Sequence, residues 1–391
     1  MKIFKKSLLA APWLLAGLSL PTLADDTFKF SGFASFVGGT FSEDNYEYAG
    51  YDDEISFSPD SIIGLQIGAQ VSDKVSVTTQ LVAKGIEDYE VEAELAYLTY
   101  SVNRDWDIRA GRMRTPFFYY SDFLDVGYAY PWIRPPADVY RVLIFSFDGV
   151  DTIYRMNHGD WSSTFQFFYG NEQEDINSAA LGVVIETEAD DLMGINVQLE
   201  NDWLTLWAGY VTLDITQSLT PPVEAAFGAL TALGLTDMVN EFDTRIPKTV
   251  DYVAFAALID YEGWLFNAEY TATDVDRASF FLNDEAWFVM AGRRFGDVTV
   301  HLTYTNRQED PDFDKNQVPE AHPLHAAVDA AFLNIDDSSL TAGIRYDVDA
   351  GIALKAEVTR FERDIAEPLF PGQDNGLDAG VLINFGVDLV F

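Results

Sequence analysis

The last twelve residues, GVLINFGVDLVF (380–391), alternate between apolar and other side chains as far as the carboxyl terminus. A period of two predicts a β-strand, because successive side chains of a strand point to opposite faces. A final strand without a polar tail needs a partner on both sides, since unpaired edge groups would otherwise remain exposed. The last strand gains its second partner if it pairs with the first. The sequence therefore favours an all-β chain closed into a barrel.

The same alternation recurs along the whole chain. We predict about sixteen strands, and most of them reach the roughly 9–11 residues that a tilted strand needs to cross a bilayer. The predicted strands lie near 27–39, 61–71, 75–85, 91–102, 106–114, 147–156, 161–170, 190–200, 203–213, 249–261, 264–275, 284–295, 298–307, 338–348, 351–363 and 379–391.

Short turns and long loops alternate between these strands. The long connections lie near 40–60, 115–146, 214–248 and 308–337, and the loop at 171–189 is acidic. An even strand number with this alternation is typical of a transmembrane antiparallel β-barrel, although a soluble sandwich or barrel also alternates. Aromatic residues at the predicted turns favour the membrane barrel, because such residues gather at membrane–water interfaces. Four tryptophans directly follow short turns: Trp106, Trp161, Trp203 and Trp264.

The N-terminal segment differs from the rest of the chain. Residues 1–24 combine a lysine-rich start, an apolar middle and a small residue, Ala24, before an acidic pair. This order predicts a secretory signal peptide, with an N-terminal membrane anchor as the alternative. Pro12 and Pro21 interrupt the apolar stretch, which disfavours the anchor. We expect residues 25–391 to form one exported barrel domain.

The chain is strongly acidic, with 63 Asp and Glu residues against 24 Lys and Arg and a formal net charge of −39. This charge argues against nucleic acid as a partner. It fits a surface that coordinates divalent cations or that is exposed to salty water. No cysteine is present, so neither disulfides nor thiolate chemistry is expected.

Catalytic motifs are missing from the sequence. It has no Gly-x-Ser-x-Gly elbow and no helical two-histidine metal motif. We therefore predict neither an enzyme nor a cofactor, with an outer-membrane hydrolase as the alternative. Glu320, His322 and His325 form a weak candidate metal group, and no metal site is predicted.

A cleaved leader, sixteen predicted strands and a last strand ending on Phe391 together resemble the Gram-negative porins. The resemblance covers the chain after Ala24 and implies a location in the outer membrane, among lipids and lipopolysaccharide. It implies that the Phe391 strand is the signal for the outer-membrane assembly machinery. It also implies a homotrimer and a third loop that folds into the barrel and narrows it.

The third long connection, within WDIRAGRMRTPFFYYSDFLDVGYAYPWIRPPADVYRVLIF (106–145), is rich in aromatic residues and proline. So much apolar area predicts packing against an inner wall. The loop together with the residues before it, 112–146, reverses the charge balance of the acidic chain, with four arginines against three aspartates, which favours anions at a constriction. Alternatively, its arginines pair with aspartates and only anchor the loop. The candidate constriction residues are Arg112, Arg114, Arg134, Arg141, Asp122 and Asp125.

Strand parity predicts which charged side chains face the lumen. We place Lys84, Arg109, Arg155, Arg345 and Lys355 on the pore wall, with Glu269, Asp347 and Glu357 beside them. Two segments, 221–242 and 321–334, are predicted to be helical and to pack within long loops. The resulting hypothesis is a water-filled channel for passive diffusion of small hydrophilic solutes, with a preference for anions. A receptor or adhesin that uses the acidic loops remains the alternative.

Overall fold

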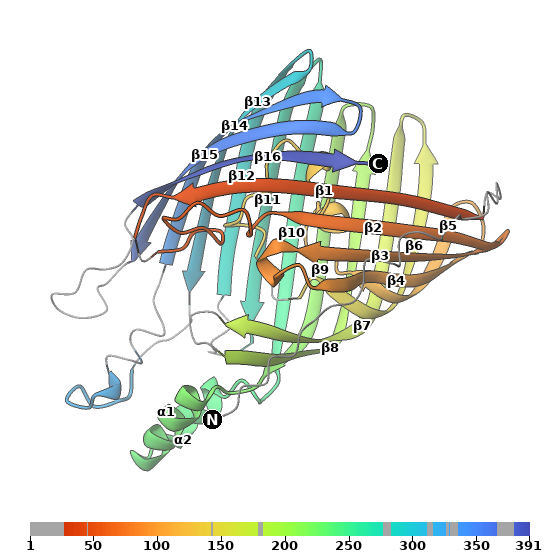
Figure 1. Ribbon diagram of the computed structural model, residues 1–391. Coiled ribbons are helices and arrows are strands. Elements are labelled where there is room, and N and C mark those ends of the chain that lie inside the picture. Colours follow the sequence, from red (N-terminus) through yellow and green to blue (C-terminus); the bar gives the residue numbers. More distant parts are fainter. Residues whose placement is uncertain are drawn as a thin grey trace, which may run out of the picture.

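A computed structural model shows one closed barrel of sixteen antiparallel strands, each paired with its neighbours in chain order (Figure 1). The structure describes residues 27–44, 46–141, 144–178, 183–276, 283–310, 316–325, 328, 335–365 and 379–391. The predicted fold class and strand number are confirmed. The signal peptide predicted at 1–24 lies outside the described residues.

Most predicted strand boundaries agree with the structure to within four residues. The exceptions are β7 and β8, which extend through most of 171–189, so the loop predicted there is wrong. Their ladder continues from Glu172–Ala189 to Ser178–Val183 past a register shift, which the polar sequence did not reveal. The strands are β1 Phe28–Phe41, β2 Ile62–Ser72, β3 Val75–Lys84, β4 Val91–Ser101, β5 Trp106–Arg114, β6 Ser146–His158, β7 Trp161–Ser178, β8 Val183–Glu200, β9 Leu204–Gln217, β10 Lys248–Tyr261, β11 Trp264–Val275, β12 Asn283–Phe295, β13 Val298–Asp310, β14 Ile335–Asp349, β15 Ile352–Ile365 and β16 Ala379–Val390.

Strand β16 pairs with β1 and closes the barrel. The terminal residue takes part in this closure: the Phe391 N–H donates to the Gly32 carbonyl at 2.9 Å, and the Gly32 N–H donates to the Phe391 carbonyl at 2.7 Å. A Cβ atom at Gly32 would approach the Phe391 ring to 2.5 Å, so the glycine makes room for the ring. The aromatic terminus is therefore a paired part of the sheet.

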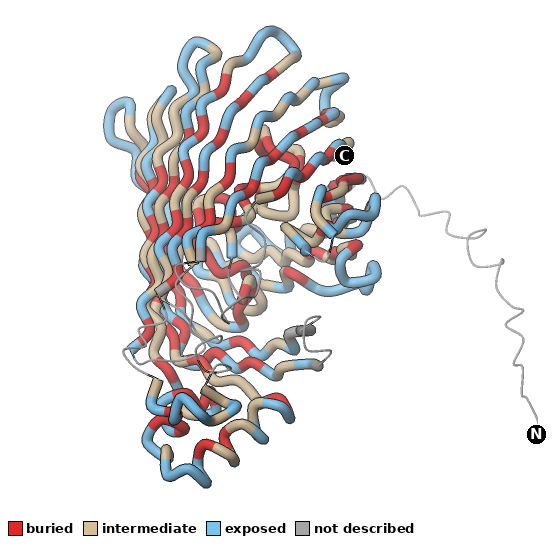
Figure 2. The backbone as a smooth tube through the Cα atoms, turned by 90° about the vertical axis from the view of Figure 1, so that its left-hand side faces the viewer, coloured by how far each residue is buried: buried red, intermediate tan, exposed pale blue. Residues whose placement is uncertain are grey.

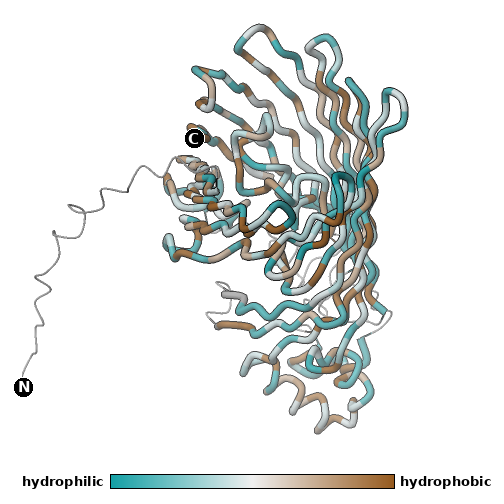
Figure 3. The backbone as a smooth tube through the Cα atoms, turned by 90° about the vertical axis from the view of Figure 1, so that its right-hand side faces the viewer, coloured by the Kyte–Doolittle hydropathy of each residue, from teal (hydrophilic) through white to brown (hydrophobic). Residues whose placement is uncertain are grey.

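The side chains of each strand alternate between lipid-facing and lumen-facing positions. In β16, Ile383 and Phe385 are exposed on the outer face, whereas Leu382, Asn384 and Asp388 are buried on the inner face. Figure 2 shows buried and exposed positions alternating along the strands, and Figure 3 shows hydrophobic positions recurring along the barrel wall. The apolar outer face and polar inner face follow the sequence alternation directly.

Two helices, α1 Pro221–Ala232 and α2 Thr236–Phe242, occupy the long loop between β9 and β10. Phe227 and Phe242 pack with Val318 of the loop between β13 and β14 in one apolar cluster. The helical prediction for 221–242 is confirmed, and the helices are packing elements between loops. Most of the second segment, 321–334, lies outside the described residues. No helix in the described part of the chain has the length and hydropathy of a membrane span.

Candidate pore constriction

The loop between β5 and β6, residues 115–145 and here called L3, folds into the barrel. Its aromatic side chains pack against the inner wall. The Phe117 ring lies 5.1 Å from the ring of Tyr252 on β10, and the Trp132 ring lies 5.5 Å from that of Phe288 on β12, measured between centroids. Both contacts belong to buried clusters that join L3 to the strands. This packing explains why L3 carries so many aromatic residues.

Hydrogen bonds from the wall fix the backbone of L3. Glu269 of β11 accepts the Tyr119 N–H at 2.9 Å and also the Tyr140 hydroxyl. Glu357 of β15 accepts the Ile133 N–H at 3.0 Å. Each carboxylate satisfies a loop N–H that has no strand partner, and hydrogen bonds to a charged acceptor contribute about 1.5–3 kcal/mol each. The inward-facing acids thus hold L3 at two separate places on the barrel wall, β11 and β15.

Two predicted wall cations also hold L3. Lys355 donates to the carbonyls of Gly127 and Trp132 and pairs with Asp388 at 2.8 Å. Arg345 donates to the Tyr128 and Tyr130 carbonyls at 2.7 and 2.9 Å. Lys355 is buried beneath the loop. It therefore lies between the strand and L3 and does not face open water.

Arg114, at the end of β5, is buried in an ion-pair cluster. It contacts Asp125 of L3 and lies 3.2 Å from Glu94 of β4, which in turn contacts Lys84 of β3. Only 6% of the Arg114 side chain is exposed. Two cations and two carboxylates therefore neutralise one another where L3 leaves the wall.

Arg134 joins L3 to the first long loop, residues 42–61, here called L1. Its guanidinium pairs with Asp60, donates to the Ala49 carbonyl at 2.6 Å and lies 5.3 Å from the centre of the Tyr51 ring. The Tyr51 hydroxyl donates to Asp60 at 2.9 Å. Burial raises the pKa of the Asp60 carboxyl, and the Arg134 guanidinium offsets part of that rise. Arg134 is 22% exposed and serves as a link between two loops.

The remaining two candidate arginines lie apart from these pairs. Arg112 contacts carboxylates of β6 and β7, Asp148 at 3.4 Å and Glu172 at 2.5 Å, so it belongs to the strands. Arg141 lies 3.9 Å from Glu309 of β13, and 52% of its side chain is exposed. Of the four candidate arginines, Arg141 is the most exposed to water.

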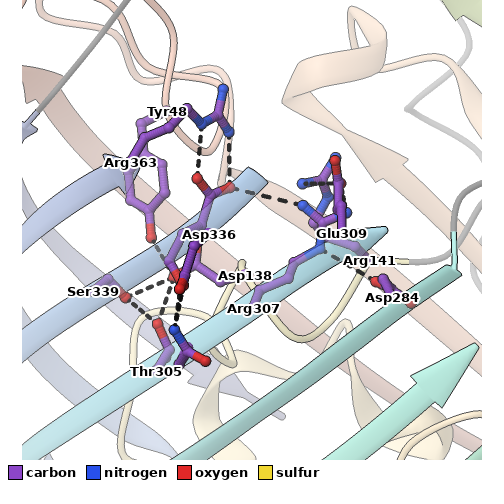
Figure 4. A network of polar contacts seen from close by, with 12 residues as sticks. Tyr48, Asp138, Arg141, Asp284, Thr305, Arg307, Glu309, Asp336, Ser339 and Arg363 are labelled. Atoms are coloured by element: carbon purple, nitrogen blue, oxygen red, sulfur yellow. Dashed lines mark hydrogen bonds and ion pairs between the residues drawn. The ribbon is translucent and has the colours of Figure 1, made fainter. Parts of the chain in front are cut away.

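A polar network around Asp138 of L3 completes the attachment to the wall (Figure 4). Asp138 accepts hydrogen bonds from the hydroxyls of Thr305 at 2.7 Å and Ser339 at 2.6 Å. The Tyr48 hydroxyl of L1 donates to the same carboxylate at 3.0 Å. One buried carboxylate thereby joins both loops to β13 and β14.

An open space remains on one side of L3. It has a volume of about 230 Å³ and lies between residues 116–123 of the loop and the inner faces of β6–β9. Asp122 faces it from L3, and Arg155 faces it from the wall with 46% of its side chain exposed. Arg155 pairs with Asp107 at 2.7 Å. The other polar residues that line it from the wall are Thr164, Gln166, Asn196 and Gln198.

Hydrogen bonds connect the wall beside this space into a row. Asn196 donates to Gln166 at 2.8 Å, and Gln166 donates to Asp151 at 2.7 Å. Arg109 donates to the same Asp151 carboxylate at 2.9 Å. The row crosses β8, β7, β6 and β5 and gives the passage a rigid polar side opposite the aromatic loop.

Comparison with known proteins identifies the family of a barrel with this inward-folded loop. Residues 11–366 match the family described as Gram-negative porin. The chain belongs to the Gram-negative porin family. The porin is an outer-membrane barrel and forms a channel, as its closed sixteen-strand wall requires.

Solved structures share the fold of this porin at low sequence identity. An anion-selective porin from Comamonas acidovorans is 13% identical, with 93% of this chain and 99% of that chain covered and a TM-score of 0.57. OmpT of Vibrio cholerae with loop L8 deleted, an outer membrane protein, is 11% identical, with the same coverage and TM-score. Salmonella typhi OmpF, solved in complex with daunomycin, is 13% identical over 93% and 97% of the two chains, with a TM-score of 0.55. No protein of curated function matches the sequence.

Several residues that fix L3 in the porin were not singled out from the sequence. Glu94 and Asp60 pair with Arg114 and Arg134, yet neither lies near its partner in the chain. Glu269 and Glu357 were placed on the lumen face by strand parity alone. Parity could identify an inward carboxylate, whereas only the folded loop shows which group it binds.

The histidines of the porin do not form a metal site in the part of the chain that is described. No group of three or more His, Asp or Glu side chains there could hold a metal ion. His322 accepts the Leu324 N–H at 3.2 Å, and His325 contacts the Val318 carbonyl at 2.6 Å. Both side chains therefore take part in local loop structure.

Proposed function

We propose that the porin conducts small hydrophilic solutes down their gradients, without catalysis, and that it favours anions. The observation that carries the proposal is the polar space left beside L3 within a closed barrel. A loop attached to several walls narrows the lumen without needing to move, which suits passive diffusion. We further propose a homotrimer with a cleaved signal peptide, 1–24, and an assembly signal at Phe391. The family and the residue patterns of 1–24 and 380–391 support these proposals.

The proposed anion preference rests on arginines that remain about half exposed. Arg141 and Arg155 can present guanidinium groups to a passing solute. The charge of Arg114 is instead neutralised by the carboxylates of Glu94 and Asp125. Charges at a constriction act on a partly dehydrated ion at lower effective dielectric. Exterior acids instead face bulk salt, where screening acts within about 8–10 Å. The anion-selective porin with the same fold gives additional support.

Single-channel recording in planar bilayers tests both parts of this proposal. The purified porin should give steady ohmic conductance, and its reversal potential in a tenfold salt gradient should have the sign for anions. Replacing Arg141 and Arg155 with Gln should shift that potential toward cations. The matched control is Asp53→Asn with Glu54→Gln, two exposed acids of L1, which should shift it less.

Each outcome discriminates between the hypotheses. Solute binding without conductance would favour a receptor role and contradict the channel. A cation-selective wild type, or a larger shift in the L1 control, would retain the channel and contradict the anion preference.

A further inference from the structure

The outer face of β9–β12 is hollowed. A depression of about 630 Å³ lies across these strands and the end of β8, and its lining is almost wholly apolar. Its floor is formed where two alanines are direct cross-strand partners, Ala257 of β10 and Ala268 of β11. Because Phe255 and Tyr270 form the next pair on the outer face of the same two strands, the small residues lie beside a rim of large rings. The sequence alternation alone gave no sign of this shape.

A second hollow of about 350 Å³ continues the first toward the short-turn end. It is lined by Ile259, Tyr261, Phe266, Trp203 and Trp264. On the outer face of β10 and β11, the pair that follows Ala257–Ala268 toward the short turn is Ile259–Phe266. The pair after that is Tyr261–Trp264. The two hollows therefore share strands and follow one another along the barrel wall.

The groove has the depth of one membrane leaflet. Trp264 and Tyr270 are six residues apart on β11, which corresponds to about 20 Å of strand at roughly 3.4 Å per residue. A strand tilted by about 45° then covers about 14 Å of depth, close to half of the roughly 30 Å hydrocarbon core. The groove begins at the short turns, which lie on the periplasmic side in barrels of this kind.

A positively charged side chain lies at the end of the groove nearest the short turns. Arg293 of β12 is the cross-strand partner of Trp264, and its guanidinium lies 4.6 Å from the centre of that ring. It donates to the Glu262 carbonyl at 2.8 Å. Among the described residues no carboxylate forms an ion pair with Arg293. Its planar fork can therefore still bind an oxyanion at the level of the lipid headgroups.

We propose that this groove is a binding site for a glycerophospholipid of the periplasmic leaflet. The phosphate lies against Arg293 and Trp264, and one acyl chain runs over Ala257 and Ala268 toward Tyr270. A phospholipid fits both chemistries at the distance that separates them. A neutral lipid would leave the cation unused, and a free phosphate would leave the apolar hollow unused.

Native mass spectrometry of the detergent-purified porin tests the site, with phosphatidylglycerol, phosphatidylethanolamine or neutral diacylglycerol added. Arg293→Gln should weaken phospholipid retention about tenfold, because a hydrogen bond to a charged group contributes at least that factor. Its control is Arg294→Gln, since the neighbouring arginine pairs with Asp260 at 3.0 Å on the other face. Retention in this control should equal that of the wild type.

A second variant examines the apolar part of the site. Ala257→Phe fills the floor from the lipid side without entering the lumen, so the barrel should assemble normally. It should reduce retention of both phospholipids, and brominated phospholipid should then quench Trp264 fluorescence less than in the wild type. Equal retention of diacylglycerol and phospholipid, or equal effects of Arg293→Gln and Arg294→Gln, would overturn the phosphate assignment. A change in oligomer mass instead of lipid number would show that the groove is a contact between copies and overturn the proposal.

Discussion

Trp132 holds the middle of L3 against the wall, and its removal should loosen the constriction. The side chain is 1% exposed, packs edge-on against Phe288 and donates from Nε1 to the Thr303 hydroxyl at 2.8 Å. Removing such a buried ring costs about 3–5 kcal/mol. At about 1.4 kcal/mol per tenfold change, 3 kcal/mol would raise the ratio of detached to docked loop by about a hundredfold.

A graded pair of variants separates packing from hydrogen bonding. Trp132→Phe keeps an aromatic ring and loses the hydrogen bond to Thr303, so its cost should be about 1 kcal/mol. Trp287→Ala is the matched control, because this tryptophan lines the outer groove and belongs to neither cluster that joins L3 to the wall.

Single-channel recording reads out the position of the loop. Trp132→Ala should show larger mean conductance and frequent fluctuations, Trp132→Phe a small increase in fluctuation, and Trp287→Ala the wild-type trace. The reasoning is refuted if Trp132→Ala keeps the wild-type conductance and noise while the folded barrel is present at wild-type amounts. The carboxylate contacts of Glu269 and Glu357 would then suffice to hold L3.

Three further predictions concern assembly, the membrane and pH. Phe391→Asp should leave exported but poorly assembled protein in the periplasm, because it puts a charge where the ring packs over Gly32; normal amounts of heat-modifiable barrel in the outer membrane would contradict this. In single-tryptophan variants, headgroup-level lipid quenchers should quench the fluorescence of Trp106, Trp161, Trp203 and Trp264 to the same extent. Four unrelated quenching depths would contradict a common aromatic belt. Because the folded state raises the pKa of Asp60, its contribution to stability is full below the unfolded pKa of about 3.9 and is lost as pH rises through the folded pKa. Thermal unfolding should therefore show the wild type gaining stability relative to Asp60→Asn as pH falls from 7 to 4; the opposite trend would mean that the pair with Arg134 outweighs burial.

The sequence determined the barrel because its information about strands is local. The period of two, the turn residues and the terminal Phe391 each act within a few positions, and together they predicted the strand number and the closure. The same parity predicted inward positions for Arg109, Glu269 and Glu357. The limit lay at β7 and β8, where polar residues in 171–189 resembled a loop although the backbones of 172–178 and 183–189 are paired.

Only the tertiary structure decided what the charged residues do. The arginines between residues 112 and 141 looked alike in the sequence, yet Arg114 and Arg134 are neutralised by Glu94, Asp125 and Asp60, while Arg141 keeps half of its surface. Two of these three carboxylates lie in other parts of the chain, and no local pattern connects them to the loop. The cost of burying an unpaired charge selects such partners, but that cost exists only once the fold has brought the groups together.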